Sequence, residues 1–162
     1  SKLIASRKNP ELEMVAHTAR LIHDVCKLIL DPFVLAEKET VESFIASEHK
    51  TILNAEQQNL GFDHAEIAAE VCQKWGIPDI ISSAIRYHHS PSASLEVELA
   101  FILHMADYIS LVTGQGYESD DFLYELEEGT MDYLGFNDSD VSDLTLELME
   151  SVAKMLEFSE ES

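Results

Sequence analysis

The sequence predicts an all-α protein, and three observations support this fold class. Apolar residues recur at the helical spacing of three and four along most of the chain. No stretch shows the sustained alternation of a strand, a glycine-rich phosphate loop or an internal repeat. The 162 residues, 46% hydrophobic and 25% charged, are enough to bury a core and have the composition of an ordinary globular domain. We therefore expect one compact helical bundle over residues 1–162.

Start and stop signals divide the first half of the chain into helices. Asn9 is a suitable N-cap and is followed by a proline at the first helical position. Asp63 is a second suitable N-cap, and glycine or proline residues end most segments. The expected segments are the tail of a helix over 1–8, a helix over 10–30, one broken helix or two over 33–60, a helix over 63–75 and a helix over 80–89.

The second half contains the most apolar stretch, from Leu95 to Val112, which we expect to be the central buried helix. An ionisable residue, Asp107, lies inside it. Shorter helices are expected around 122–126 and 131–134, and an amphipathic helix over 141–158 ends the chain.

The charge balance excludes some partners. The chain has 31 acidic and 10 basic residues, a net charge of −21, and such a surface repels phosphate backbones and anionic lipids. We therefore expect a protein partner rather than nucleic acid or a membrane. Cys26 and Cys72 have no repeated spacing, which is typical of reduced, buried thiols. With no signal peptide and no apolar run near 20 residues, we expect a cytoplasmic protein.

The pair His23-Asp24 lies in the middle of an apolar helical pattern. Burying both side chains costs several kcal/mol unless each finds a partner, and a metal ion or a hydrogen-bonded cluster would supply one. Other predicted helices carry further candidates: His64, His88, His89 and Asp107. Asp107 either pairs locally or belongs to a site with the others. We hypothesise that these positions converge.

Helical geometry orders these candidates. Adjacent residues diverge by about 100°, so His88 and His89 cannot both face one point. His88 continues the apolar face of Ile81 and Ala84, so we expect His88 inward and His89 at the mouth. For His104 we favour a structural role over a hydrogen bond to Asp107.

Imidazole and carboxylate ligands together suit iron, manganese, zinc or a similar divalent metal. A metal held in this way lowers the pKa of bound water and can activate it against a phosphoester. Lys27 lies one turn after His23 and could orient a phosphate oxygen; a solvated lysine at a helix end explains it equally well. A site that no longer binds metal also stays open.

Several motifs together resemble one known family. The segments that carry the resemblance are Leu21-Ile22-His23-Asp24-Val25-Cys26-Lys27, Leu60-Gly61-Phe62-Asp63-His64-Ala65-Glu66, Ala84-Ile85-Arg86-Tyr87-His88-His89 and Leu103-His104-Met105-Ala106-Asp107-Tyr108. In order, spacing and flanking residues they resemble the HD superfamily of metal-dependent phosphohydrolases, and most closely its HDOD (HD-related output domain) branch of bacterial signalling proteins. The resemblance covers about residues 12–114 and implies a helical bundle of the HD-domain type.

The resemblance also implies roles for individual residues. The positions that match metal ligands of catalytic relatives are His23, Asp24, His64, His88 and Asp107, with His89 as a less certain addition. If the site is catalytic, Asp24 and Lys27 are the residues expected to act in catalysis. Cys26 stands where the family pattern has glycine, and no Gly-Tyr-Pro signature follows the paired histidines. The family's first metal histidine and its N-terminal helical subdomain would precede residue 1, so we expect a fragment or a shortened version.

Two functions follow, and the sequence does not decide between them. The first is a regulatory signalling domain, non-catalytic or weakly catalytic, that binds a protein partner and holds a divalent metal or none. The alternative is a metal-dependent phosphodiesterase acting on a nucleotide or cyclic dinucleotide. The missing signature and the acidic surface favour the first, and the surviving ligand-type residues favour the second.

Overall fold

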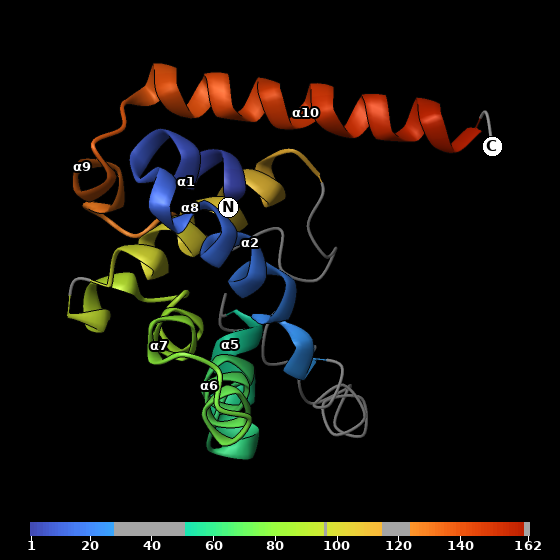
Figure 1. Ribbon diagram of the computed structural model, residues 1–162. Coiled ribbons are helices and arrows are strands. Elements are labelled where there is room, and N and C mark those ends of the chain that lie inside the picture. The colour runs from blue at the N-terminus through green and yellow to red at the C-terminus, as the bar shows by residue number, and fades with distance from the viewer. Residues whose placement is uncertain (28–50, 96, 115–123, 161–162) are drawn as a thin grey trace.

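The computed structural model describes residues 1–27, 51–95, 97–114 and 124–160, and these ranges form helices with no strand (Figure 1). The predicted all-α fold is confirmed. The elements are α1 (Lys2–Lys8), the 3-10 helix η1 (Pro10–Leu12), α2 (Glu13–Ile22), α5 (Ile52–Leu60), α6 (His64–Lys74), α7 (Asp79–Arg86), the 3-10 helix η2 (Pro91–Ser94), α8 (Glu98–Val112), α9 (Thr130–Leu134) and α10 (Asp138–Glu160).

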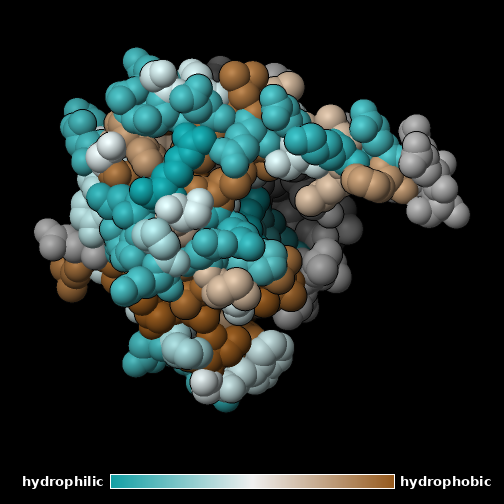
Figure 2. All heavy atoms as spheres, turned by 45° about the horizontal axis from the view of Figure 1, so that its top comes forward, coloured by the Kyte–Doolittle hydropathy of each residue, from teal (hydrophilic) through white to brown (hydrophobic). Residues whose placement is uncertain are grey.

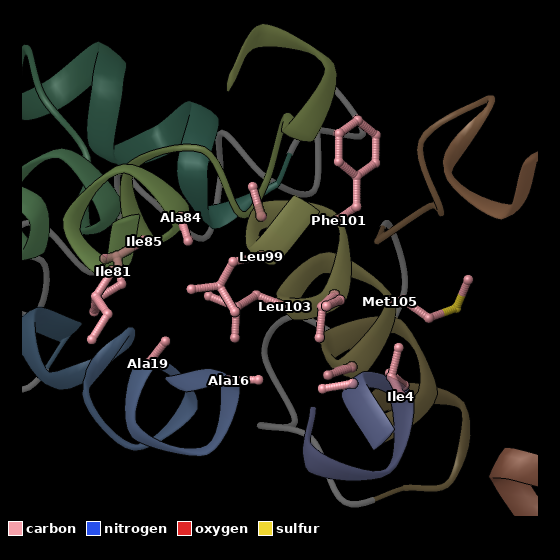
Figure 3. Close-up of a cluster of buried hydrophobic side chains, with 14 of the residues drawn as sticks. Ile4, Ala16, Ala19, Ile81, Ala84, Ile85, Leu99, Phe101, Leu103 and Met105 are labelled. Atoms are coloured by element: carbon pink, nitrogen blue, oxygen red, sulfur yellow. The ribbon is translucent and has the colours of Figure 1, made fainter. Parts of the chain in front are cut away.

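Helix α8 is the centre of the bundle, as the sequence predicted. Its residues are buried on nearly every side, and Leu99 and Leu103 are fully inaccessible to solvent. Figure 3 shows Leu99 between Ala19 of α2 and Ala84 of α7, while Met105 points away from them. Because α8 contacts α1, α2 and α7, a polar residue on it, such as Asp107, is held at a fixed place inside the bundle.

The start of α6 is fixed by a reciprocal capping box. The Asp63 carboxylate accepts from the backbone N–H of Glu66 at 2.8 Å, and the Glu66 carboxylate accepts from the backbone N–H of Asp63 at 3.3 Å. Just before it, α5 ends at Gly61, whose φ of +79° is the left-handed conformation that favours glycine. Both signals were predicted, and they place His64 at the first residue of α6.

Helix α10 packs on the bundle through its first half. Leu144 is buried, Val141 and Leu148 pack against the core, and Glu147 forms an ion pair with Arg7 of α1 at 2.7 Å. The second half extends past the body of the bundle (Figure 1). Figure 2 shows hydrophilic residues along one side of this projecting part and apolar residues along the other.

Two predicted helices are interrupted or end early. The helix expected over 10–30 is interrupted by a turn at His23 and Asp24, after which residues 25–27 are helical again, and the helix expected to reach His89 stops at Arg86. In the first case the ring of His23 bonds the carbonyl of Arg20, the acceptor that the N–H of Asp24 would use in a continuing helix. Residues 28–50 lie outside the described residues, and so do the expectations for them.

The prediction of a helix around 122–126 is wrong for its described part, because residues 124–127 have no regular structure. The Glu127 carboxylate accepts from the backbone N–H of Ser92 at 3.1 Å and from the Ser92 hydroxyl. These bonds to a side chain, and not a helical ladder of backbone bonds, hold the segment. Within the described part of the chain, no helix combines the length and the apolar character needed to cross a bilayer.

Candidate metal centre

Residues from four separate segments meet at one place beside α8. The Nε2 atom of His23 lies 3.1 Å from Asp24 Oδ2 and 3.3 Å from Asp107 Oδ1. On the other side of Asp24, its Oδ1 atom lies 3.6 Å from His64 Nε2 and 3.8 Å from His88 Nε2. The structure therefore brings together the positions that the sequence analysis singled out, although they are spread over 85 residues of chain.

His23 and His88 are oriented by the same local bond. Each follows the end of a helix, and each Nδ1 lies close to the backbone carbonyl three residues earlier: Arg20 at 2.8 Å and Ile85 at 2.6 Å. Carbonyls in the last turn of a helix have no partner within the helix, so the imidazoles satisfy them. Because a carbonyl only accepts, a ring hydrogen is assigned to Nδ1 of each, and in the neutral imidazole the lone pair is then on Nε2, the nitrogen that faces the centre.

His64 reaches the same arrangement through a carboxylate. Glu56 Oε2 accepts from His64 Nδ1 at 2.7 Å and from the His64 backbone N–H at 3.0 Å. Glu56 is only 3% exposed. A carboxylate behind a histidine fixes the ring and strengthens the other nitrogen as a metal ligand. The sequence analysis missed Glu56, although it lies three residues after Leu53 and four before Leu60.

Several polar atoms at this place lack a hydrogen-bond partner. Among the described residues, the buried side-chain atoms without a partner are Asp24 Oδ1, His88 Nε2, Asp107 Oδ2 and, elsewhere, Thr130 Oγ1. Native proteins rarely leave such atoms unpaired, because each costs about 1–3 kcal/mol. Three of the four lie in one cluster, which suggests that a ligand completes it.

The donor set fits a divalent metal. Ligand atoms about 2.1 Å from one ion lie roughly 3.0–4.2 Å from each other. The distances from Asp24 Oδ1 to His64 Nε2 and His88 Nε2, 3.6 and 3.8 Å, fall in this range. In two sets of described residues, one ligand atom of each residue lies within 4.8 Å of the others. The sets are His64, His88 and His89, and His23, Asp24 and His88. Nitrogen with one or two carboxylates suits zinc, iron or manganese.

His88 and His89 take the places that the helical pattern predicted. His88 is fully buried, and His89 is partly exposed. The rings lie 3.9 Å apart, and His89 Nε2 is 2.9 Å from His64 Nε2. His89 can therefore join a metal bound to His64 from the side nearer to solvent.

The histidines of the pair are neutral. Burial lowers the pKa of His88 to about 3, and it lowers the pKa of His89 well below the ordinary value. Each ring therefore keeps one nitrogen lone pair at neutral pH, which is the state that metal binding requires.

The carboxylates are ionised. Burial acts to raise the pKa of Asp24, but the hydrogen bond and charge of His23, with Lys27, lower it below the ordinary value. For Asp107 burial acts in the same direction, and His23 with Arg20 brings the pKa down to about 2. Burial lowers the pKa of His23, but Asp107 and Asp24 outweigh burial and raise it.

Two cationic side chains border the centre. Lys27 Nζ lies 3.2 Å from Asp24 Oδ2. On the opposite side, Arg20 Nη1 contacts both Asp107 Oδ1 and His23 Nε2. The sequence analysis did not select Arg20, although it shares the buried face of α2 with Ala16 and lies three residues before His23.

His104 supports the centre from behind, in the structural role that the sequence analysis favoured. Its Nδ1 donates to the carbonyl of His88 at 2.8 Å, and its Nε2 accepts from the N–H of Glu127 at 2.9 Å. Burial lowers the pKa of His104, so it stays neutral and keeps both bonds. It thus ties the backbone of the paired histidines to the segment after α8.

Comparison with known proteins gives one match, to a protein family. No curated protein and no solved structure matches the chain. The family model of the HDOD domain matches residues 1–91, more than half of the chain. The matched region includes His23, Asp24, His64 and the pair His88-His89, while Asp107 lies beyond it. The chain belongs to the HDOD domain family.

Proposed function

We propose that this chain is a cytoplasmic regulatory signalling domain that holds a divalent metal ion and acts through a protein partner, with little or no catalysis of its own. One observation supports the metal: the Nδ1 atoms of three imidazoles, His23, His64 and His88, lie on oxygen acceptors. Their Nε2 atoms all face the Asp24 carboxylate, His23 at Oδ2 and the other two at Oδ1. The candidate ligands in the centre are His23, Asp24, His64, His88, His89 and Asp107, and Asp24 Oδ1 lies nearest to His64 and His88.

Two features support weak catalysis. Cys26, two residues after Asp24, stands where the family pattern has a glycine, and its buried side chain packs in the hydrophobic core. The Arg20 guanidinium contacts two of the ligand atoms, which leaves less room for a substrate. The sequence also lacks the Gly-Tyr-Pro signature.

A protein partner fits the surface better than a polyanion does. The net charge is −21, and the projecting part of α10 combines acidic side chains with exposed Met149 and Met155 (53% and 71% exposed). Such a helix face suits a partner that presents basic and apolar residues together.

A second candidate, a phosphohydrolase acting on a nucleotide or cyclic dinucleotide, rests on Lys27. Its ammonium lies 3.2 Å from Asp24 Oδ2, so it could hold a phosphate oxygen beside the centre. A bound metal would supply Lewis-acid chemistry there, and the ionised Asp24 carboxylate would help to hold it.

Metal analysis of the purified protein tests the first proposal. We expect about one equivalent of metal or more in the wild type and a loss of most of it in Asp24→Ala. Asp143→Ala changes an exposed carboxylate on α10 and is the matched control. A wild type with less than about a tenth of an equivalent after incubation with Zn²⁺, Mn²⁺ or Fe²⁺ would contradict the metal site. Hydrolysis of bis(p-nitrophenyl) phosphate that is lost in Asp24→Ala with an intact fold would favour the second candidate.

A further inference from the structure

Arg20 has an unusual position with respect to the centre. Its guanidinium Nη1 contacts Asp107 Oδ1 and His23 Nε2, two atoms that are 3.3 Å apart. Its backbone carbonyl accepts the hydrogen of His23 Nδ1 at 2.8 Å. Arg20 therefore holds His23 at both ring nitrogens, with its backbone on one side and its cation on the other.

This contact divides the centre into two halves. In the first half Asp24 Oδ1 and His88 Nε2 have no hydrogen-bond partner, and His64 Nε2 lies 3.6 Å from Asp24 Oδ1. In the second half the atoms that face a shared ion, His23 Nε2 and Asp107 Oδ1, already contact a positive charge. The first half thus offers lone pairs on Asp24 Oδ1 and His88 Nε2, while Lys27 contacts the other Asp24 oxygen, Oδ2. In the second half Arg20 contacts His23 Nε2 and Asp107 Oδ1, which leaves Asp107 Oδ2 as its one unpaired atom among the buried side-chain atoms of the described residues.

A guanidinium cannot give up its charge to make room for a metal. Arginine stays protonated in proteins, so an ion bound between His23 and Asp107 would have to displace the side chain or lie against it. The guanidinium is also placed where its charge is useful, because the carboxylates of both Asp24 and Asp107 lie within 3.3 Å of His23 Nε2. One divalent ion and one arginine together balance more negative charge than one ion alone.

We propose that Arg20 is a built-in cation that takes the place of a second metal ion, so that this centre binds a single divalent ion, on the side of Asp24, His64 and His88. The inference rests on the proposed metal binding and adds its stoichiometry. It also gives Arg20 a role in the centre, where it pairs with Asp107 and fixes the orientation of His23.

Titration of metal-free protein with Mn²⁺ tests this inference, with calorimetry for stoichiometry and electron paramagnetic resonance for the spin coupling of adjacent ions. We expect one equivalent of uncoupled Mn²⁺ in the wild type. Arg20→Met removes the charge and keeps much of the side-chain volume, and Arg20→Ala opens the position fully; we expect each to bind two equivalents with a coupled signal. Arg20→Lys, which keeps the charge, should stay at one.

Arg86→Ala is the matched control, because Arg86 also forms an ion pair, with Glu70, but on the surface at the end of α7. It should bind one equivalent. Circular dichroism and thermal melting show which variants fold. If Arg20→Ala does not fold, the titration of Arg20→Met alone tests the inference. Two equivalents in the wild type, or one in Arg20→Met, would overturn the role of Arg20 while leaving the proposed function intact. No Mn²⁺, Zn²⁺ or Fe²⁺ in the wild type would overturn both.

Discussion

The carboxylate of Glu56 holds His64 at two points, accepting the ring hydrogen of Nδ1 at 2.7 Å and the backbone N–H at 3.0 Å. The first bond fixes which nitrogen faces the centre, and the second ties the first residue of α6 to α5. Both side chains are buried, so water does not compete for either bond. Helix α5 thus takes part in the centre although none of its residues is predicted to touch the metal.

Glu56→Gln should weaken metal binding without unfolding the protein. The amide can still accept one hydrogen bond, but the charge that strengthens His64 as a ligand is lost, and such changes lower metal affinity by roughly 10–100-fold. Competition with a chromophoric chelator measures the affinity. Glu70→Gln, at an exposed carboxylate on α6, is the control and should leave it unchanged. Equal affinities in wild type and Glu56→Gln would show that the Glu56–His64 bond serves packing alone.

Metal binding should stabilise the fold, because the ligands come from separate segments that unfolding pulls apart. At a free metal concentration of 100 times Kd, the free energy of unfolding should rise by about 2.7 kcal/mol. Thermal melting with EDTA and then with added Zn²⁺ measures the difference. Asp24→Ala should melt at the same temperature in both conditions. A wild type whose melting temperature does not respond to metal would count against the site.

The sequence predicted the positions that carry a recognisable polar residue inside an apolar pattern. Asp107 within the apolar run of α8 and the pair His23-Asp24 both stood out for this reason. The structure places His23 Nε2 3.3 Å from Asp107 Oδ1. The caps at Asp63 and Gly61 were predicted from local rules that need only a few neighbouring residues. Local signals were therefore sufficient for these parts.

Glu56 and Arg20 were missed because their importance depends on what lies opposite them in space. Glu56 belongs to a stretch of polar residues on α5 and looks solvated, yet it is buried against His64. Arg20 looks like a helix-surface residue, yet it reaches Asp107, which is 87 residues away in the chain. A search for charged residues on the apolar face of each helix, at spacings of three and four, would have found both.

The helix ends near the centre were misjudged for a related reason. Periodicity predicted that α2 would continue through His23 and that α7 would continue through His88, because both lie on the apolar faces. In each case the imidazole takes a carbonyl of the last turn, which a continuing helix would need for its own ladder. Side-chain competition for the backbone cannot be inferred from an apolar pattern.

The capping box of α6 should contribute measurably to stability. Asp63 accepts from the Glu66 N–H at 2.8 Å and from the Gln57 side chain at 2.7 Å, so Asp63→Ala should lower the free energy of unfolding by about 1–2 kcal/mol. Urea unfolding followed by circular dichroism measures the change. Asp63→Asn can still accept at the cap and should cost less. If Asp63→Ala and Asp63→Asn lower the free energy of unfolding equally, the Asp63 carboxylate would stabilise the protein through its charge rather than through capping.

The two halves of α10 should respond differently to truncation of an apolar side chain. Leu144 is 1% exposed and packs in the core, so Leu144→Ala should lower the free energy of unfolding by about 2–5 kcal/mol. Met155 is 71% exposed on the projecting half, so Met155→Ala should change it by less than about 0.5 kcal/mol. Paired urea titrations give both values. A loss above about 1 kcal/mol in Met155→Ala would mean that the projecting half is packed in the isolated protein, because exposed positions rarely cost as much.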